Sequence, residues 1–444
     1  MIKQSLFIFS LLILGFQQAQ AQTVLTLKEC LERGIGNNLS LQSKRNEITK
    51  GQYGVSENRA RLLPQINAFA NYNDNPEAPV SVTDGSAYGN LYNVTQTLRA
   101  NATAGLQLQM PLYNQTLYAT MKVARMAHEL SKLSYEKARE DLTMQIAQMY
   151  YLGQNTAEQI AIVKSNIARL EELKSITEAF HDNGMAMEVD VKRVNINLEN
   201  LKVQYDNACA MLEQQLNLMK YVLDYPADEA IAFTPVNPEK VQTASLTGLS
   251  EDLYELQLIE QQKQLTEQQK KMIGYGYLPS VYLKGSLMWQ AFTDKSYHWF
   301  HSGPSNKWYR SYGVGVSLNV PIFDGLDKKY KRRKADIDLQ NICLTQQNAR
   351  KQLQTQYLNA TNDLYNNRRN FRKQKDNYRL AEEVYAVTLD RYREGIASMT
   401  ELLQDEMRMS EAQNLYVSAH YNYRVTNLTL LKLTGALDRL GAEE

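Results

Sequence analysis

The sequence predicts an α+β protein made of two similar halves, each with a helix, two strands and a long helical hairpin. Three observations predict this fold class. Short landmarks of the first half recur in the same order about 210 residues later. Two pairs of segments alternate apolar and polar residues, as strands do. Proline-free stretches that follow each pair are long enough for unusually long helices.

The repeated landmarks are a Leu-Pro dipeptide, a strand-like run that contains a proline, and a glycine turn. They divide the chain into a first repeat at 22–223, a connector at 224–250, a second repeat at 251–434 and a short polar tail at 435–444. The landmark pairs are Leu63-Pro64 and Leu278-Pro279, Gln109–Tyr113 and Asn319–Phe323, and Gly184 and Gly395.

Residues 1–21 have the features of a secretory signal peptide. Lys3 gives a positive start, Leu6–Phe16 is an apolar run, and Ala19-Gln-Ala21 is a small-residue cleavage site. After this segment no apolar run is long enough for a membrane-spanning helix. The net charge is only +1, so no overall field favours nucleic acid. We expect an exported protein with no nucleic-acid partner.

The sequence shows no metal or cofactor motif. Cys30, Cys209 and Cys343 are odd in number and widely spaced, which fits neither a disulfide framework nor a zinc site. Cys209 and Cys343 lie in helical pattern, where we predict buried thiols. His298 and His301 fall in a predicted loop; a metal site there competes with the interpretation as two ordinary loop histidines, because no further ligands accompany them.

The first element of each repeat is a helix, at 26–62 and at 250–277. Pro64 and Pro279 follow these helices, and proline disfavours helical geometry in the residue before it. The connector at 224–250 contains three prolines and lacks helical period, so it is predicted to lie against the helices.

Four strands follow by period-two alternation, at about 65–73, 102–111, 280–291 and 312–322, with Pro111 and Pro321 at the junctions to the helices. Such strands fit an outer-membrane barrel, and also a soluble sheet with one wet face. The signal peptide favours the membrane. Since known single-chain barrels need about eight strands or more, four strands imply a barrel shared between copies. The polar connections at 73–101 and 292–311 are predicted surface loops.

The helices after the strands are exceptionally long. From 114 to 181 there is no proline and a single glycine, Gly153, so this helix reaches roughly 100 Å at 1.5 Å per residue. The return helices carry coiled-coil spacing that we interpret as packing seams. These seams are Leu198, Leu201, Tyr205, Ala208 and Leu212 in the first repeat, and Met409, Ala412, Tyr416, Ala419 and Tyr423 in the second.

A basic run, Lys328–Lys334, follows the last strand directly. In an exported protein it is not a nuclear signal. Two interpretations stay open: a belt that contacts inner-leaflet phosphates of the outer membrane, and a plain solvated helix face.

The chain resembles the TolC-like outer-membrane efflux and secretion proteins, in its two halves, the Leu-Pro endings, the run Val320–Gly325 and the glycine tips. The resemblance covers nearly the whole mature chain. It implies a homotrimer whose twelve strands form one outer-membrane barrel, continued by a periplasmic helical tunnel. It also implies that the tips narrow the tunnel and meet a periplasmic adaptor, which works with an inner-membrane pump.

The resemblance also assigns a periplasmic gate. Matching by distance from the tip glycines gives the gate acids Asp190 and Glu401, with Tyr392 expected to hydrogen-bond Asp190. An arginine of the family is absent, where Ala397 stands; a second family acid is replaced by Gln404, with Asp405 one step along. The adaptor-docking tips would be Gly184, Met185, Ala186, Gly395, Ile396, Ala397 and Ser398. Without the resemblance, Asp190 and Glu401 are ordinary acids favoured by helix dipoles.

The main functional hypothesis is therefore a passive exit duct of a tripartite efflux pump or a type I secretion system. The alternative is a periplasmic coiled-coil scaffold or adaptor without a pore, which predicts a protein soluble without detergent. An enzyme is not expected, since the sequence has no phosphate loop, Cys/His cluster or Gly-x-Ser-x-Gly turn.

Overall fold

The computed structural model describes residues 23–77, 80–84, 89, 92–96, 98–236, 248–293 and 307–440. The predicted signal peptide, His298, His301 and the end of the tail lie outside these residues. The chain forms two compact units. One, called the sheet unit, comprises 47–132 and 259–345; the other, called the hairpin unit, comprises 1–46, 133–258 and 346–444.

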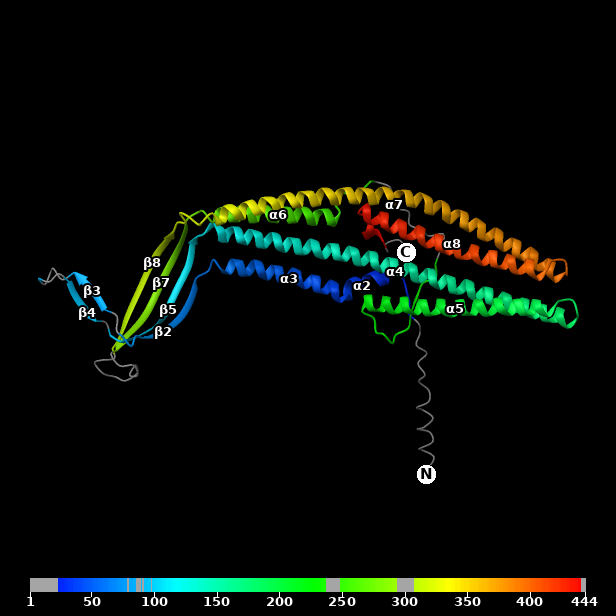
Figure 1. Cartoon of the computed structure of the whole chain (residues 1–444), viewed down its shortest axis with the longest axis horizontal. Coiled ribbons are helices and arrows are strands. Elements are labelled where there is room, and N and C mark those ends of the chain that lie inside the picture. Colours follow the sequence, from blue (N-terminus) through cyan, green and yellow to red (C-terminus); the bar gives the residue numbers. More distant parts are fainter. Residues whose placement is uncertain are drawn as a thin grey trace, which may run out of the picture. The chain divides into compact units, whose positions relative to one another are not determined.

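The sheet unit contains a four-stranded antiparallel sheet of β2 (Gln65–Asp74), β5 (Ala100–Tyr113), β7 (Ser280–Thr293) and β8 (Trp308–Asn319), in the order β2-β5-β7-β8 (Figure 1). All four predicted strands are present. The bounds of the last are corrected, because it was expected at 312–322 and instead ends at Asn319, paired with Ser280. Pro321, which has no amide hydrogen to donate, follows two residues later. β5 runs through Pro111, with a register shift before Tyr113.

The predicted alternation survives across the whole sheet. Ile66 pairs with Leu108, Leu108 with Gly285 and Gly285 with Val314, so these residues share one face. The neighbouring row runs through Asn67, Gln107, Ser286 and Gly313 and faces the other way. The strands therefore present one largely apolar face and one polar face, as the period-two pattern predicts.

The predicted loop at 73–101 is partly wrong. It contains a small antiparallel hairpin of β3 (Val80–Asp84) and β4 (Tyr92–Gln96), a separate two-stranded sheet. At its base Arg99 pairs with Asp74, with 2.8 Å between Nε and Oδ1. Strands of five residues carry too little periodicity to be recognised in a polar, proline-containing stretch.

The first predicted helix is in fact two helices, α2 (Leu27–Asn37) and α3 (Leu39–Ala60). The break falls at Asn38, whose Oδ1 accepts a hydrogen bond from the Leu41 amide at 3.1 Å. Its Nδ2 donates to the Val222 carbonyl at 2.9 Å. An asparagine side chain that satisfies backbone groups in this way competes with helix continuation. The matching helix of the second repeat, α6 (Tyr254–Tyr275), is unbroken.

The long hairpins are confirmed. The first consists of α4 (Gln115–Asp182) and α5 (Glu188–Leu223), the second of α7 (Asp327–Arg393) and α8 (Met399–Leu433), and the two arms of each lie side by side toward their tip (Figure 1). The predicted seams lie in the core to different degrees. In α8 all five residues are buried or half-buried, whereas in α5 only Leu198 and Leu201 are fully buried.

The connector packs on the hairpin unit through a short parallel pair, β1 (Thr23–Leu25) and β6 (Ile231–Phe233). This pair was not predicted. It explains Gly153, the single glycine of α4: a Cβ there would lie 2.1 Å from Phe233 Cε2. The glycine therefore leaves the space that the Phe233 ring occupies, and Gln154 Nε2 donates to the Thr234 carbonyl at 2.6 Å.

Three further observations concern the cysteines, the tail and the question of membrane-spanning helices. Cys30 is buried, but Cys209 and Cys343 are only half-buried, so the prediction of buried thiols at those two positions is wrong for the isolated chain. The tail contains a 3-10 turn at Leu437–Arg439 that buries Leu437 and Leu440. Among the described residues, no helix is both long and apolar enough to cross a membrane.

Candidate functional site at the two helical tips

The two tips are built from the same backbone turn. Gly184 and Gly395 each have φ of 75°, with open space where a Cβ would be. The Met185 amide donates to the Phe180 carbonyl at 2.7 Å, and the Ile396 amide donates to the Arg391 carbonyl at 2.8 Å. These bonds close a helix C-terminus in the manner of a Schellman motif, for which glycine is preferred at the left-handed position. The predicted tips are thus real turns, with glycines required by their backbone.

The predicted gate acids begin the return helices. Asp190 lies in the first turn of α5 and Glu401 in the first turn of α8. The Glu401 amide donates to Ser398 Oγ at 3.2 Å, which makes Ser398 the N-cap of α8. Met187 holds the equivalent position without a side-chain cap. Negative charge in a first turn is favoured by the helix dipole, so both acids are stabilised where they stand.

Tyr392 does not make the expected hydrogen bond to Asp190. Its hydroxyl lies 3.4 Å from Thr177 Oγ1, which itself donates to the Leu173 carbonyl, so the tyrosine is the donor. Asp190 instead accepts from Arg193 at 3.1 Å. Tyr392 is 6 % exposed, its ring lies 5.7 Å from that of Phe180, and burial raises the pKa of its hydroxyl. It therefore joins the hairpins through an apolar contact and a neutral hydrogen bond.

Three arginines make ion pairs or hydrogen bonds at the tips. None of them is at position 397, where the family arginine was expected. Arg393 of the second hairpin pairs with Glu172 of the first at 2.6 Å, and Arg193 of the first donates to Thr400 Oγ1 of the second at 3.2 Å. Arg391 lies 3.5 Å from Glu401 within its own hairpin. Sequence reasoning missed these residues because each is ordinary in a helix until its partner is known, and the partners Glu172 and Thr400 belong to the other hairpin.

Ala397 explains why no arginine is needed at its own position. The residue is 8 % exposed and belongs to an apolar cluster under the tips that includes Met399, Leu402 and Tyr392. An arginine side chain here would need to leave this cluster to reach solvent. The arginines of the tips lie instead on nearby helix faces, where their side chains are exposed.

The remaining predicted gate residues are dissimilar. Gln404 is exposed, whereas Asp405 is buried and accepts hydrogen bonds from Thr388 Oγ1 at 2.8 Å and from Arg408 at 3.2 Å. Beside it, Glu406 is 5 % exposed, and burial raises the pKa of its carboxyl. The described chain thus holds Asp405 within the second hairpin and leaves Gln404 facing outward.

The predicted docking residues are mostly accessible. Met185 is 68 % exposed and Ile396 is 63 % exposed, although both are large and apolar. Gly184, Gly395 and Ser398 are also exposed, while Ala186 is half-buried and Ala397 is buried. The tip surface therefore presents exposed apolar side chains from both hairpins: Met185 and Met187 from the first, and Ile396 from the second.

Two repeats of sheet and long helical hairpin, with matching glycine tips, define the class of outer-membrane channel subunits. The chain belongs to the outer membrane efflux protein family, whose model matches residues 31–222 and 255–436. It is an outer-membrane efflux protein, and the scaffold hypothesis is not supported.

Curated relatives agree with this assignment. The chain is 23 % identical over 436 residues to a probable efflux pump outer membrane protein, TtgC, of Pseudomonas putida, covering 92 % of this chain and 82 % of the relative. It is 19 % identical over 403 residues to the outer membrane protein TolC of Escherichia coli, covering 86 % of this chain and 77 % of TolC.

Solved structures show the same fold. The chain is similar to CusC, with a TM-score of 0.76, 15 % identity and coverage of 96 % of this chain and 95 % of that one. It is also similar to the outer membrane protein VceC of Vibrio cholerae, with a TM-score of 0.73, 16 % identity and coverage of 92 % and 96 %.

Proposed function

We propose that three copies of this chain form one outer-membrane exit duct, in which a twelve-stranded barrel continues into a periplasmic helical tunnel. The observation that carries this proposal is the four-stranded sheet, which has an apolar face and leaves β2 and β8 as edge strands. An edge in lipid leaves backbone groups unpaired at several kcal/mol each. Pairing β8 of one copy with β2 of the next removes both edges.

The tips form the closed end of this duct in our proposal. Three copies of Glu401 around one axis make an acidic ring that favours cations and limits the aperture. The apolar cluster under the tips and the Arg393–Glu172 pair hold the two hairpins together, and opening separates them. We keep Asp190 and Gln404 as further gate residues and assign Asp405 to stabilising its own hairpin.

The partner that opens the duct is a periplasmic adaptor joined to an inner-membrane pump, which supplies the energy. Met185 and Ile396 support docking at the tips, because exposed apolar side chains with polar surroundings mark protein contacts. The same duct serves a tripartite efflux pump or a type I secretion system, and transport through it requires no chemistry by this chain.

The test is photo-crosslinking in the native host, with a reactive amino acid at Ile396 or at Met185. At either position the reactive group replaces an exposed side chain. Ser398 is left unchanged because its side chain caps α8. The control carries the same group at Leu358 on α7, which is 53 % exposed and far along the helix from the tip. We expect the tip probes to capture a periplasmic adaptor and the control to capture none.

Two outcomes of this experiment would contradict the proposal. If the protein is in the outer membrane and both tip probes capture only other copies of this chain, adaptor docking at the tips is wrong. If the protein fractionates with soluble periplasmic proteins, the duct itself is wrong.

A further inference from the structure

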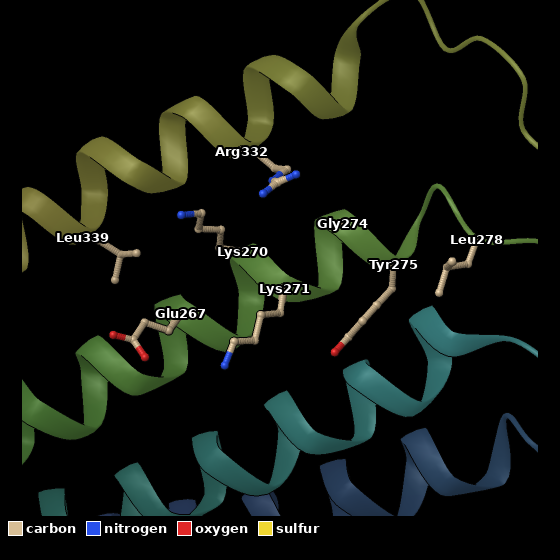
Figure 2. Close-up of a pocket in the computed structure, with 8 residues that line it drawn as sticks. All are labelled: Glu267, Lys270, Lys271, Gly274, Tyr275, Leu278, Arg332 and Leu339. Carbon is tan, nitrogen blue, oxygen red and sulfur yellow. The ribbon is translucent and has the colours of Figure 1, made fainter.

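The basic run Lys328–Lys334 contributes one residue, Arg332, to the lining of a cleft in the sheet unit. Figure 2 shows the cleft between α6 and the start of α7, with Lys270 and Lys271 on one helix and Arg332 on the other. The cleft has a volume of about 640 Å³, and both apolar and polar side chains line it. Its lining residues are Glu267, Lys270, Lys271, Gly274, Tyr275, Leu278, Arg332 and Leu339.

Several cations around this cleft have no acidic partner. Asp336 pairs with Lys270, Asp327 with Lys331 and Asp324 with Lys328. Within the described part of the chain, no carboxylate forms an ion pair with the other basic side chains of the run or of the cleft. These are Lys271, Lys329, Arg332, Arg333 and Lys334.

The geometry inside the cleft favours an anion. Figure 2 shows Lys270 of α6 and Arg332 of α7 both extending into the space between the two helices, and Lys271 extending from the opposite side of α6. Asp336 neutralises Lys270 alone, so the guanidinium of Arg332, with its fork of donors, is left to bind an oxyanion.

Apolar side chains lie beside these charges along the chain. Leu278 lines the cleft, is 42 % exposed and comes two residues before β7. The loop between β8 and α7 exposes Ile322 at 96 % and Phe323 at 79 %. Basic residues next to exposed leucine, isoleucine and phenylalanine are the pattern of surfaces that lie in a membrane interface.

We propose that this cleft binds the phosphate of an anionic glycerophospholipid, with Arg332 as its principal ligand and Lys271, which lines the cleft from the other side of α6, as a second cation. The inference rests on the proposed function, because it takes the sheet to be in the outer membrane. Short loops, at 276–279 and 320–326, connect the helices that carry these residues to the strands, and Arg332 lies only five residues after the start of α7, about 8 Å along it. The phosphate therefore sits at the edge of the apolar sheet face, in the leaflet facing the helices, and Leu278 contacts the lipid's apolar part.

The experiment is native mass spectrometry of the detergent-purified protein, titrated with phosphatidylglycerol. The test variant is the pair Lys271→Gln and Arg332→Gln. The matched control is Arg369→Gln with Arg372→Gln, which removes the same charge from exposed positions farther along α7. At about fivefold per cation, the test variant should bind roughly 25-fold more weakly, and the control should bind as the original protein does. The charge-conserving pair Lys271→Arg and Arg332→Lys should retain binding.

Each other outcome overturns the proposal. Equal affinity of the test variant and the control shows that the cleft is not the site. Displacement of the lipid by inorganic phosphate at equal concentration shows a site for free anions. Loss of the oligomer in the test variant assigns these cations to a contact with a second copy. A protein that inserts in the outer membrane and exports normally, yet binds no phosphatidylglycerol, refutes the lipid site and leaves the duct intact.

Discussion

Gly184 and Gly395 hold a backbone conformation that most side chains adopt only at a cost. Both have φ of 75°, and neither has atoms nearby that a Cβ would strike. The requirement is therefore conformational rather than steric, and the same turn chemistry is used in both repeats. The sequence revealed these two positions because glycine at a helix end has one dominant structural reason.

Gly395→Ala should destabilise the second tip by about 1 kcal/mol, because alanine in a left-handed conformation costs roughly 1–2 kcal/mol. Hydrogen exchange of the amides at 396–402 measures the effect as faster local opening. The control is Gly54→Ala in α3, which also faces open space but has no positive φ, and it should be neutral or slightly stabilising. Unchanged exchange at the tip in Gly395→Ala would contradict the account.

His420 gives the hairpin unit a sensitivity to acid. It is 2 % exposed, stacks on Phe371 at 4.9 Å, and burial lowers its pKa to about 4. Because the folded pKa lies below the unfolded value, its contribution to stability is complete above pH 6.5 and is lost as pH falls toward 4.

His420→Phe should therefore reduce the loss of thermal stability between pH 6.5 and pH 4. The ring still stacks on Phe371, and Nε2, which has no hydrogen-bond partner among the described residues, is removed. Melting temperatures of both proteins across this range provide the measurement. Parallel curves for the original protein and the variant would show that His420 does not titrate in the folded state.

At the scale of secondary-structure elements, the sequence predicted the helices and strands that occur in both repeats. It missed the features that depend on a single distant contact. The hairpins and four strands were predictable, because their periodicity extends over many residues. The break at Asn38 was not, since it depends on a hydrogen bond to Val222, 184 positions away. The β1–β6 pair was missed for a similar reason: each strand has three residues, and the Phe233 ring lies in space that depends on the distant Gly153.

The candidate site shows the same limit. The resemblance proposed Asp190, Glu401 and Tyr392 as gate residues from their distance to a glycine, but the contacts between hairpins could not be predicted from spacing. Tyr392 bonds Thr177, and Arg393 reaches Glu172, because the hairpins pack in a particular register.

Arg393→Gln should loosen the closed tips by removing the ion pair to Glu172. Both side chains are substantially exposed, so each pair contributes on the order of 0.2–1 kcal/mol, and the open probability should rise by at most about fivefold for each of the three copies. Single-channel recording measures this ratio. The exchange Arg393→Glu with Glu172→Arg should restore the original value; failure to restore it would mean that the pair does not link the hairpins in the closed state.

At the scale of the whole molecule, a single chain leaves strand edges and apolar surface uncovered. Its sheet has two edge strands, and its long helices expose many apolar side chains, among them Leu358, Val387 and Leu415. Exposed apolar area of this extent marks surfaces that contact other chains. The proposed assembly of three copies would cover the edges and the exposed helix faces together.

The most direct test of the duct is the electrical conductance of the purified protein in a planar lipid bilayer. For the original protein we predict small, cation-selective conductance steps, because the closed tips and the proposed Glu401 ring restrict the pore. For Glu401→Gln we predict a larger conductance with weaker cation selectivity. Control recordings use Glu411→Gln, an exposed acid of the same helix farther from the tip. Absence of any conductance from protein that inserts as an oligomer, or an identical selectivity in Glu401→Gln, would contradict a duct closed at its tips.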